Sequence, residues 1–221
     1  MLKNAALKRG MKPAIILAVA VLVFAVLAAV IVYSNLISRS QPQAFSTTSV
    51  GGLPLPSWAI TFGNPKAPVT LIELFDLHCP YCAMAHEQLD PLYRELLKTG
   101  KLRLVFLDLI VHPEAAPAHQ YLHCAYSQLG NKTYDLITQL YRVFLSDGPQ
   151  KQLEILQSYR CTDAPSKSDF DSAVKELLGA LVQKGVAIRQ LGTPTFIIIK
   201  NGTINVVVGA DVARVASLIS Q

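Results

Sequence analysis

The sequence predicts an α/β domain with an inserted helical subdomain, preceded by one transmembrane helix. Three observations support this fold class. Residues 14–37 form an apolar stretch without charge. An apolar run, Val69–Phe75, leads through a short polar turn into the amphipathic pattern of a helix that begins at a Cys-x-x-Cys pair. A long segment with helical periodicity, about residues 114–191, then separates this unit from two β-branched runs near the end of the chain.

The apolar stretch from Ala14 to Ile37 is long enough for a membrane-spanning helix. At a rise of about 1.5 Å per residue, a helix of this length exceeds a hydrocarbon core of about 30 Å. The apolar region of a cleaved signal peptide is shorter, about 7 to 15 residues. We therefore expect an uncleaved signal anchor over a cleaved signal peptide.

The flanking charges predict the orientation of this helix. The N-terminal segment, residues 1–13, carries four basic residues, and only Arg39 closely follows the span. By the positive-inside rule, residues 1–13 stay in the cytoplasm and the following domain is extracytoplasmic, so we expect a single-pass protein of the cell membrane. Residues 1–39 hold five basic residues and no Asp or Glu, so they account for the whole formal net charge of +5. The charge balance therefore gives no support for nucleic-acid binding.

Residues 38–57 predict a linker, because they are rich in Ser, Thr, Gln, Gly and Pro and show little periodicity. The globular domain, residues 58–221, is expected to begin with a short strand at Trp58–Phe62. The run Val69–Phe75 is apolar on both faces, which is typical of a central, covered strand.

A helix is expected from about Pro80 to Lys98, ending at Gly100. The run Leu102–Leu107 predicts the next strand, which this helix connects in parallel to the preceding one. Residues 114–191 follow with helical periodicity and no good strand signal, and turn residues divide them into about four helices. We interpret them as an insertion into the α/β domain.

Two β-branched runs, residues 195–200 and 203–208, flank Asn201-Gly202. Asn-Gly between such runs predicts a hairpin with a two-residue type I′ turn. A short helix, from Asp211 to about Ile219, is expected to close the chain, with Asp211 as its N-cap.

The residues most indicative of chemistry are Cys79 and Cys82, in Cys79-Pro-Tyr-Cys82. The strand–turn–helix pattern places Cys79 at a helix N-terminus, where free N–H groups and the helix dipole lower the pKa of a thiol. Cys82, one turn later on the same face, can attack Cys79 and close a disulfide. The pair predicts a redox-active dithiol, with Cys79 as nucleophile and Cys82 as resolving thiol. Half of a zinc site and an inert disulfide are the alternatives.

Two ionisable residues near this pair are candidates for a supporting role. Glu73 interrupts an apolar run, and burying a carboxylate is costly unless it is hydrogen-bonded or protonated. It is either an exposed acid at the strand edge or a buried acid beneath Cys82 that carries a proton when this thiol ionises. His78 either adds positive charge near the Cys79 thiolate or is a solvated loop residue. We interpret His86 as structural.

A second motif, Gly192-Thr-Pro-Thr-Phe196, stands directly before the predicted hairpin. Pro194 cannot donate a ladder hydrogen bond, and a conformational constraint such as a cis Thr193–Pro194 peptide bond would explain its place ahead of a buried strand. An ordinary trans proline at the start of a strand is the alternative.

With both motifs in this order, the sequence resembles the thioredoxin superfamily. The helical segment between them is similar to the DsbA-type branch of exported thiol–disulfide oxidoreductases, and the resemblance covers about residues 58–221. It implies a thioredoxin fold in which Pro194 is cis and faces the active-site disulfide, while the backbone of Thr193 pairs with a substrate strand. Glu73 stands six positions before Cys79, where DsbA-type proteins carry a buried acid, which favours the proton-relay interpretation.

The dipeptide Pro80-Tyr81 departs from the Pro-His of the best-known strong oxidant of this branch, and this dipeptide tunes the thiolate and the redox potential. Pro-Tyr also occurs in glutaredoxins and in some dimeric isomerase-like relatives. Glutaredoxins lack the insertion, and the dimeric relatives carry a dimerisation domain that the segment 38–57 cannot supply. The resemblance thus favours an oxidase over an isomerase, and we expect a monomer.

Some DsbA-like proteins have a second, structural disulfide in the insertion, which here would join Cys124 and Cys161. A rival is a metal site formed by His119, His123 and Cys124, since the two histidines are spaced i, i+4 on one helix face. Cys124 directly follows His123 and points elsewhere on the helix, so we expect the disulfide and no metal. Four cysteines outside the cytoplasm fit an oxidising compartment.

The sequence therefore predicts a membrane-anchored, extracytoplasmic thiol–disulfide oxidoreductase that introduces disulfide bonds into exported cysteine-containing proteins without a cofactor. By resemblance, a quinone-linked membrane partner reoxidises it. A reductase or isomerase using the same residues is the alternative. An alternative of another class is a non-catalytic module that binds a metal or an exported partner through the loop from Cys79 to Cys82.

Overall fold

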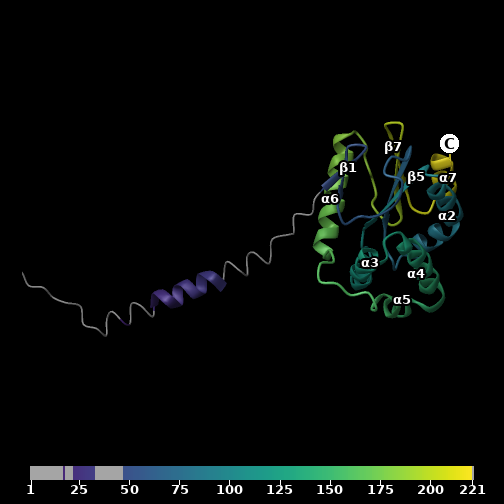
Figure 1. The fold of residues 1–221 in the computed structure, drawn as a ribbon. Coiled ribbons are helices and arrows are strands. Elements are labelled where there is room, and N and C mark those ends of the chain that lie inside the picture. The colour runs from purple at the N-terminus through teal and green to yellow at the C-terminus, as the bar shows by residue number, and fades with distance from the viewer. Residues whose placement is uncertain (1–16, 18–21, 33–46, 221) are drawn as a thin grey trace, which may run out of the picture. The chain divides into compact units, whose positions relative to one another are not determined.

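The computed structural model describes Leu17, residues 22–32 and residues 47–220 (Figure 1). The chain divides into two units, Met1–Gln43 and Ala44–Gln221. In the first unit, residues 22–32 are helical and belong to the predicted membrane span. Among the described residues, no helix has both the length and the apolar character to cross a membrane. Apart from Leu17, the rest of the span 14–37, the segment 1–13 and residues 38–46 of the predicted linker lie outside the described residues.

Residues 47–56, predicted as part of a linker, instead form a hairpin. Strand β1 (Thr47–Val50) pairs antiparallel with β2 (Leu53–Pro56). Leu53 and Leu55 point to one side of β2 and are buried against α6 (Lys167–Gln183). The composition of this segment is that of a linker, but its alternating leucines have an apolar partner more than a hundred residues away.

The second unit is built on one mixed sheet of five strands in the order β3-β5-β4-β6-β7. β4 and β5 are parallel, and every other neighbouring pair is antiparallel. The parallel return and the C-terminal hairpin are therefore confirmed. The strands are β3 (Ile60–Gly63), β4 (Val69–Phe75), β5 (Leu102–Asp108), β6 (Thr195–Lys200) and β7 (Thr203–Val208).

All seven residues of β4 are buried, because helices cover both faces of the sheet. Leu71 and Phe75 contribute to the core beneath α2 (Pro80–Lys98), to which α7 (Val212–Ser220) also contributes. Ile72 and Leu74 point the other way, into the core beneath α6 and the hairpin. Figure 1 shows α6 on one side of the strands and α2 with α7 on the other.

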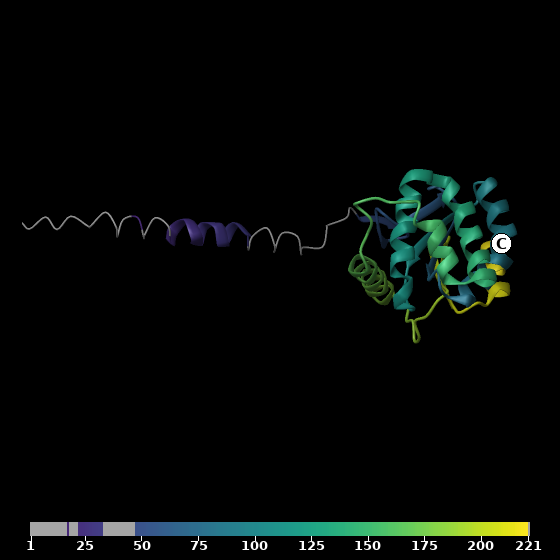
Figure 2. The same ribbon diagram turned by 90° about the horizontal axis from the view of Figure 1, so that it is seen from below.

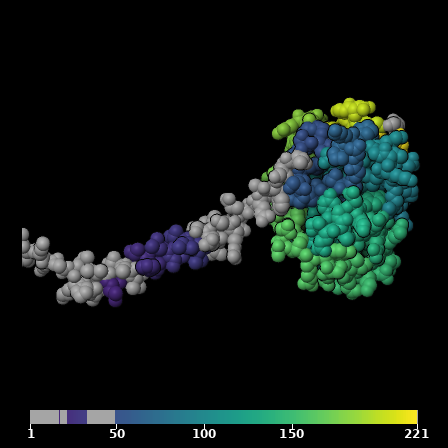
Figure 3. Space-filling model, viewed as in Figure 1, coloured from purple at the N-terminus to yellow at the C-terminus, as the bar shows by residue number. Residues whose placement is uncertain are grey.

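The predicted helical insertion is confirmed as α3 (Ala116–Leu129), α4 (Thr133–Asp147), α5 (Pro149–Leu156) and α6. α4 packs on α2 and α5 packs on α3 and α4. Figure 2 shows α3, α4 and α5 side by side in front of the sheet, and Figure 3 shows teal and green atoms over the lower part of the visible face. Helices α3, α4 and α5 therefore lie at the same end of the sheet as the start of α2, whereas α6 covers the opposite face.

The C-terminal elements follow the predicted local signals. Asn201 and Gly202 adopt positive φ of 50° and 75° between β6 and β7, as a type I′ turn requires. The Asp211 carboxylate accepts the N–H of Arg214 at 3.1 Å, so Asp211 caps α7.

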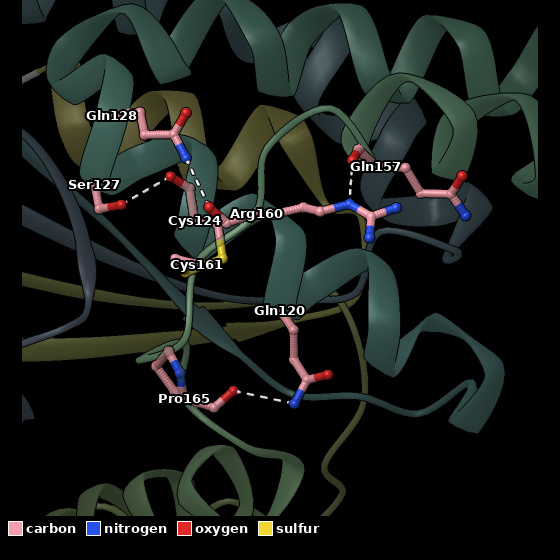
Figure 4. Close-up of a disulfide and its surroundings, with 8 residues drawn as sticks. All are labelled: Gln120, Cys124, Ser127, Gln128, Gln157, Arg160, Cys161 and Pro165. Atoms are coloured by element: carbon pink, nitrogen blue, oxygen red, sulfur yellow. Dashed lines mark hydrogen bonds between the residues drawn. A yellow bond between two sulfur atoms is a disulfide. The ribbon is translucent and has the colours of Figure 1, made fainter.

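Cys124 of α3 forms a disulfide with Cys161 of the loop between α5 and α6 (Figure 4). The same loop also accepts a side-chain hydrogen bond from α3, where Gln128 Nε2 lies 3.3 Å from the carbonyl oxygen of Arg160. The predicted disulfide is confirmed, and it removes Cys124 from the alternative metal site.

We expect the double substitution Cys124→Ser/Cys161→Ser to lower the free energy of unfolding by about 3 to 4 kcal/mol, because the 37-residue separation closes a long loop. Guanidinium unfolding measures this change. Gln128→Ala, which removes only the side-chain bond to the same loop, is the control and should cost about 1 kcal/mol or less. Equal losses in the two variants would contradict a stabilising role of the cross-link.

Candidate active site

Cys79 occupies the N-cap position of α2. Its φ of −90° and ψ of 114° are extended, and Pro80 is the first helical residue. Pro at this position loses no helical hydrogen bond, because the first N–H groups of a helix have no partner within it. The N–H of Cys79 donates to the carbonyl oxygen of Asp76 at 3.1 Å, which closes the turn between β4 and the helix. The predicted position of Cys79 at a helix N-terminus is confirmed.

The two sequence motifs meet at the Cys79 sulfur. Its thiol donates to the carbonyl oxygen of Thr193 at 3.3 Å, across 114 positions of sequence. The Thr193–Pro194 peptide bond is cis, as predicted. Pro194 is buried, and its own carbonyl oxygen accepts the N–H of Gly209 at 2.8 Å. The carbonyl of Thr193, just before the start of β6, thus faces the sulfur of Cys79.

The surroundings of Cys79 favour its thiolate. A hydrogen bond from the Cys82 thiol and others from the N–H groups of Cys82 and Tyr81 outweigh burial and lower the pKa of Cys79 to about 6. Donors at a helix N-terminus stabilise a thiolate in this way. At neutral pH the reduced pair of cysteines therefore carries one negative charge, on the sulfur of Cys79.

Cys82 has the opposite electrostatics. Its side chain is fully buried, and burial, the hydrogen bond to Cys79 and the charge of Glu73 raise the pKa of Cys82 well above its ordinary value. Both cysteines are free thiols in this structure. One thiol of the pair is therefore poised as a thiolate and the other is held as a protonated thiol.

Glu73 lies in the sheet beneath α2. It points to the same face of β4 as Leu71 and Phe75, and its register partners on the neighbouring strands are Phe106 and Phe196. The carboxyl group is fully buried, and neither oxygen has a hydrogen-bond partner within the described part of the chain. Burial and the nearby charge of Cys79 raise the pKa of Glu73 to about 8. The interpretation of an exposed acid is therefore wrong, and Glu73 is neutral at pH 7.

His78 fulfils neither of its two predicted roles. It is only 8% exposed, and its ring is stacked on Phe144 with the centroids 5.7 Å apart. Burial lowers the pKa of His78, so the imidazole is neutral at pH 7 and adds no positive charge beside Cys79. Pro80 and Tyr81, by contrast, are exposed, with Tyr81 at 60%.

His86 is structural, as predicted. It is buried one turn after Cys82, and its Nε2 lies 2.9 Å from the hydroxyl of Thr138 on α4. The ring also packs against Tyr141, with the centroids 5.3 Å apart. Burial lowers the pKa of His86 to about 4, so it stays neutral and joins α2 to α4.

Sequence reasoning missed two buried carboxylates beside the site, Asp76 and Asp108. Asp76 follows β4 and Asp108 ends β5, and both are fully buried. Asp108 binds the two histidines of the alternative metal site, with His119 Nδ1 at 2.6 Å and His123 Nε2 at 2.9 Å. The signal was present, because the carboxyl ends of parallel neighbours meet at one sheet edge. Both acids follow such strands.

A family model described as thioredoxin matches residues 58–206. The chain belongs to the thioredoxin family. No curated protein sequence matches it significantly.

Solved structures of similar fold span most of the thioredoxin-like domain. Oxidised BdbD from Bacillus subtilis is 18% identical with a TM-score of 0.52, covering 77% of this chain and 96% of that chain. A periplasmic thioredoxin-like protein from Salmonella enterica serovar Typhimurium is 17% identical with a TM-score of 0.51, covering 73% and 88%. DsbA2 from Pseudomonas aeruginosa is 22% identical with a TM-score of 0.48, covering 75% and 94%. At these identities the first two similarities establish the fold of the thioredoxin-like domain.

Proposed function

We propose that this thioredoxin-family protein is a membrane-anchored thiol–disulfide oxidoreductase that introduces disulfide bonds into exported proteins. The observation that carries the proposal is that the pKa values of the two thiols are shifted in opposite directions. Cys79 lies at a helix N-terminus against the carbonyl of Thr193, and its pKa is lowered to about 6. Cys82 is buried beneath it with a raised pKa. A low-pKa thiolate is a good leaving group, which favours transfer of a disulfide to a substrate.

The reaction begins from the Cys79–Cys82 disulfide. A substrate thiolate attacks Sγ of Cys79, the bond between the two cysteines breaks, and Cys82 leaves as a thiolate that takes up a proton. A second substrate thiolate attacks the substrate sulfur of the mixed disulfide, and Cys79 leaves as a thiolate. The substrate loses two electrons to form its disulfide, and the protein gains them as the reduced pair.

Glu73 is the proposed proton donor to Cys82. Its carboxyl group is neutral at pH 7 because burial, and to a smaller extent the charge of Cys79, raises its pKa to about 8. The Cys82 thiolate formed in the first step lies in a buried site, where an unpaired charge is costly. A proton from Glu73 neutralises the thiolate and moves the charge to the Glu73 carboxylate, which then takes up a proton from water. On reoxidation Cys82 gives up its proton and a proton returns to water by the reverse route.

The backbone of Thr193 is the proposed docking site for an extended substrate segment, which would pair as an added strand beside Pro194. Exposed apolar side chains lie close to both motifs in the sequence. Tyr81 and Met84 belong to the first turns of α2, and Leu191 precedes Thr193 by two positions, with exposures of 60%, 40% and 40%. Such a surface suits unfolded cysteine-containing polypeptides.

Residues 14–37 are the proposed membrane anchor, with residues 1–13 in the cytoplasm and the thioredoxin-like domain outside it. The supporting observations are the uncharged apolar sequence and the excess of basic residues before it. We expect reoxidation by a quinone-linked partner in the same membrane, since anchoring both proteins there raises their effective concentration.

Equilibration of the full chain in glutathione buffers, in a Cys124→Ser/Cys161→Ser background, tests the proposed direction. For a disulfide oxidase we expect a reduction potential of about −120 mV. We also expect thiolate absorbance to give a Cys79 pKa of about 6. A potential near about −270 mV would overturn it in favour of a reductase. Stoichiometric metal together with absent thiol oxidation would instead indicate a binding module.

A further inference from the structure

The loop before Cys79 is bound on both sides by the helical insertion. The N–H of Leu77 donates to Nε2 of His119 on α3 at 3.0 Å. The carbonyl oxygen of the same residue accepts from Nε2 of Gln152 on α5 at 3.2 Å. Leu77, His119 and Gln152 are all fully buried. Helix α3 thus binds the peptide group before Leu77, and helix α5 binds the peptide group after it.

Within the turn itself, the remaining N–H groups are bonded locally. The N–H of His78 donates to Oδ1 of Asp76 at 2.8 Å, and the N–H of Cys79 donates to the Asp76 carbonyl at 3.1 Å. Leu77 therefore stands out as the residue of this turn whose N–H and carbonyl are both bound from the insertion. Because Cys79 follows two residues later in the same turn, the position of Leu77 determines the position of Cys79.

His119 is itself held in one orientation. Its Nδ1 lies 2.6 Å from Oδ1 of Asp108, which is fully buried at the end of β5. Hydrogen bonds to Asp108 and Asp76 outweigh burial and raise the pKa of His119 to about 9, which favours an imidazolium. The N–H of Leu77, however, requires a lone pair on Nε2. The Leu77 bond is 3.0 Å long, whereas Nε2 is 3.7 Å from Oδ1 of Asp76. These distances favour the neutral ring with its proton on Nδ1, donated to Asp108.

We propose that His119 and Gln152 are positioning residues for Cys79, which act by binding the backbone N–H and carbonyl of Leu77. They hold the turn that places the Cys79 sulfur at the start of α2 and against Thr193. The inference rests on the proposed function and gives the insertion a part in the chemistry of a site it does not itself form. Loss of the His119 acceptor leaves a buried N–H unpaired, and the turn must move to satisfy it.

The two ring nitrogens of His119 can be replaced separately. The side-chain amide of asparagine reaches about the position of Nδ1, and that of glutamine reaches about the position of Nε2. His119→Asn therefore keeps a donor for Asp108 and removes the acceptor for Leu77, whereas His119→Gln keeps the acceptor for Leu77. Neither variant can carry a charge at this position, so a difference between them reports geometry.

The experiment titrates the thiolate absorbance of the reduced full chain, in the Cys124→Ser/Cys161→Ser background. We expect the pKa of Cys79 to rise by about one unit in His119→Asn and to stay within about 0.3 units of the parent protein in His119→Gln. Gln152→Met, which removes the donor to the Leu77 carbonyl, is expected to raise the pKa in the same direction. The unfolding temperature of each variant verifies that the folded protein is titrated.

His123→Asn is the matched control, because His123 lies on the same helix and binds the same Asp108 through Nε2, a position that asparagine does not reach. The N–H and carbonyl of Leu77 are bonded instead to His119 and Gln152. It should lower the unfolding temperature without moving the Cys79 pKa. Equal shifts in the two His119 variants, or no shift in His119→Asn and Gln152→Met, would overturn the proposal. The parent protein's pKa and potential test the proposed function separately, since the comparison of variants holds for an oxidase and a reductase alike.

Discussion

Replacing Cys79 with serine is expected to abolish thiol oxidation, with a rate lower by at least about a thousandfold. Cys79 is the sulfur that lies at the helix N-terminus and against Thr193, and Cys82 is fully buried beneath it. A serine hydroxyl cannot form or break a disulfide. The measurement is the oxidation rate of a dithiol peptide by the full chain in a glutathione disulfide buffer.

Cys82→Ser is the matched comparison, since it removes the other thiol of the same pair. We expect it to lose oxidation equally, because the disulfide can no longer close, but to keep a Cys79 that is alkylated rapidly near neutral pH. It should also accumulate a mixed disulfide with oxidised substrates, because the resolving thiol is gone. Turnover by Cys79→Ser, or rapid alkylation of that variant at Cys82, would contradict the assignment of the two roles.

Glu73→Gln is expected to change the pH dependence of stability by on the order of 4 kcal/mol between pH 4 and pH 9. Burial, with a smaller effect from the charge of Cys79, raises the pKa of Glu73 from 4.5 to about 8 in the reduced protein. Burial, the larger cause, also acts in the oxidised form. Between these values the unfolded chain has lost a proton that the folded protein keeps, so the stability of the wild-type protein falls as the pH rises. A glutamine does not titrate, so the variant gains stability relative to wild type over this range.

The measurement is urea unfolding of both proteins at several pH values, in the oxidised form, where neither active-site thiol titrates. The oxidised form is used because the lowered pKa of Cys79 has the opposite effect on stability from the raised pKa of Glu73. It makes the reduced protein more stable as the pH rises from about 6. Glu87→Gln makes the same chemical change at an exposed position of α2 and is the control. A constant difference between wild type and Glu73→Gln at all pH values would show that Glu73 is not a buried, titrating acid.

Much of the fold follows from local patterns. The apolar run of β4, the helical spacing after Pro80 and the Asn201-Gly202 turn each depend on neighbours within a few residues, so their periods and turn residues predict them. The hairpin at residues 47–56 does not, because its leucines are buried against α6, far away in sequence. A composition typical of a linker says nothing about such a distant partner.

The sequence by itself determined the dithiol, its place at a helix N-terminus and the presence of the Thr193–Pro194 motif, since each depends on residue type and short spacing. That this motif faces the dithiol was implied only by the resemblance to the thioredoxin superfamily. The tertiary structure alone decided the state of the ionisable groups around them. Glu73 is neutral because it is buried between two covered strands, and His78 is neutral because burial lowers its pKa. Asp108 holds His119 beside the turn. Burial and hydrogen bonding set these states, and both arise from contacts between residues that the chain order keeps apart.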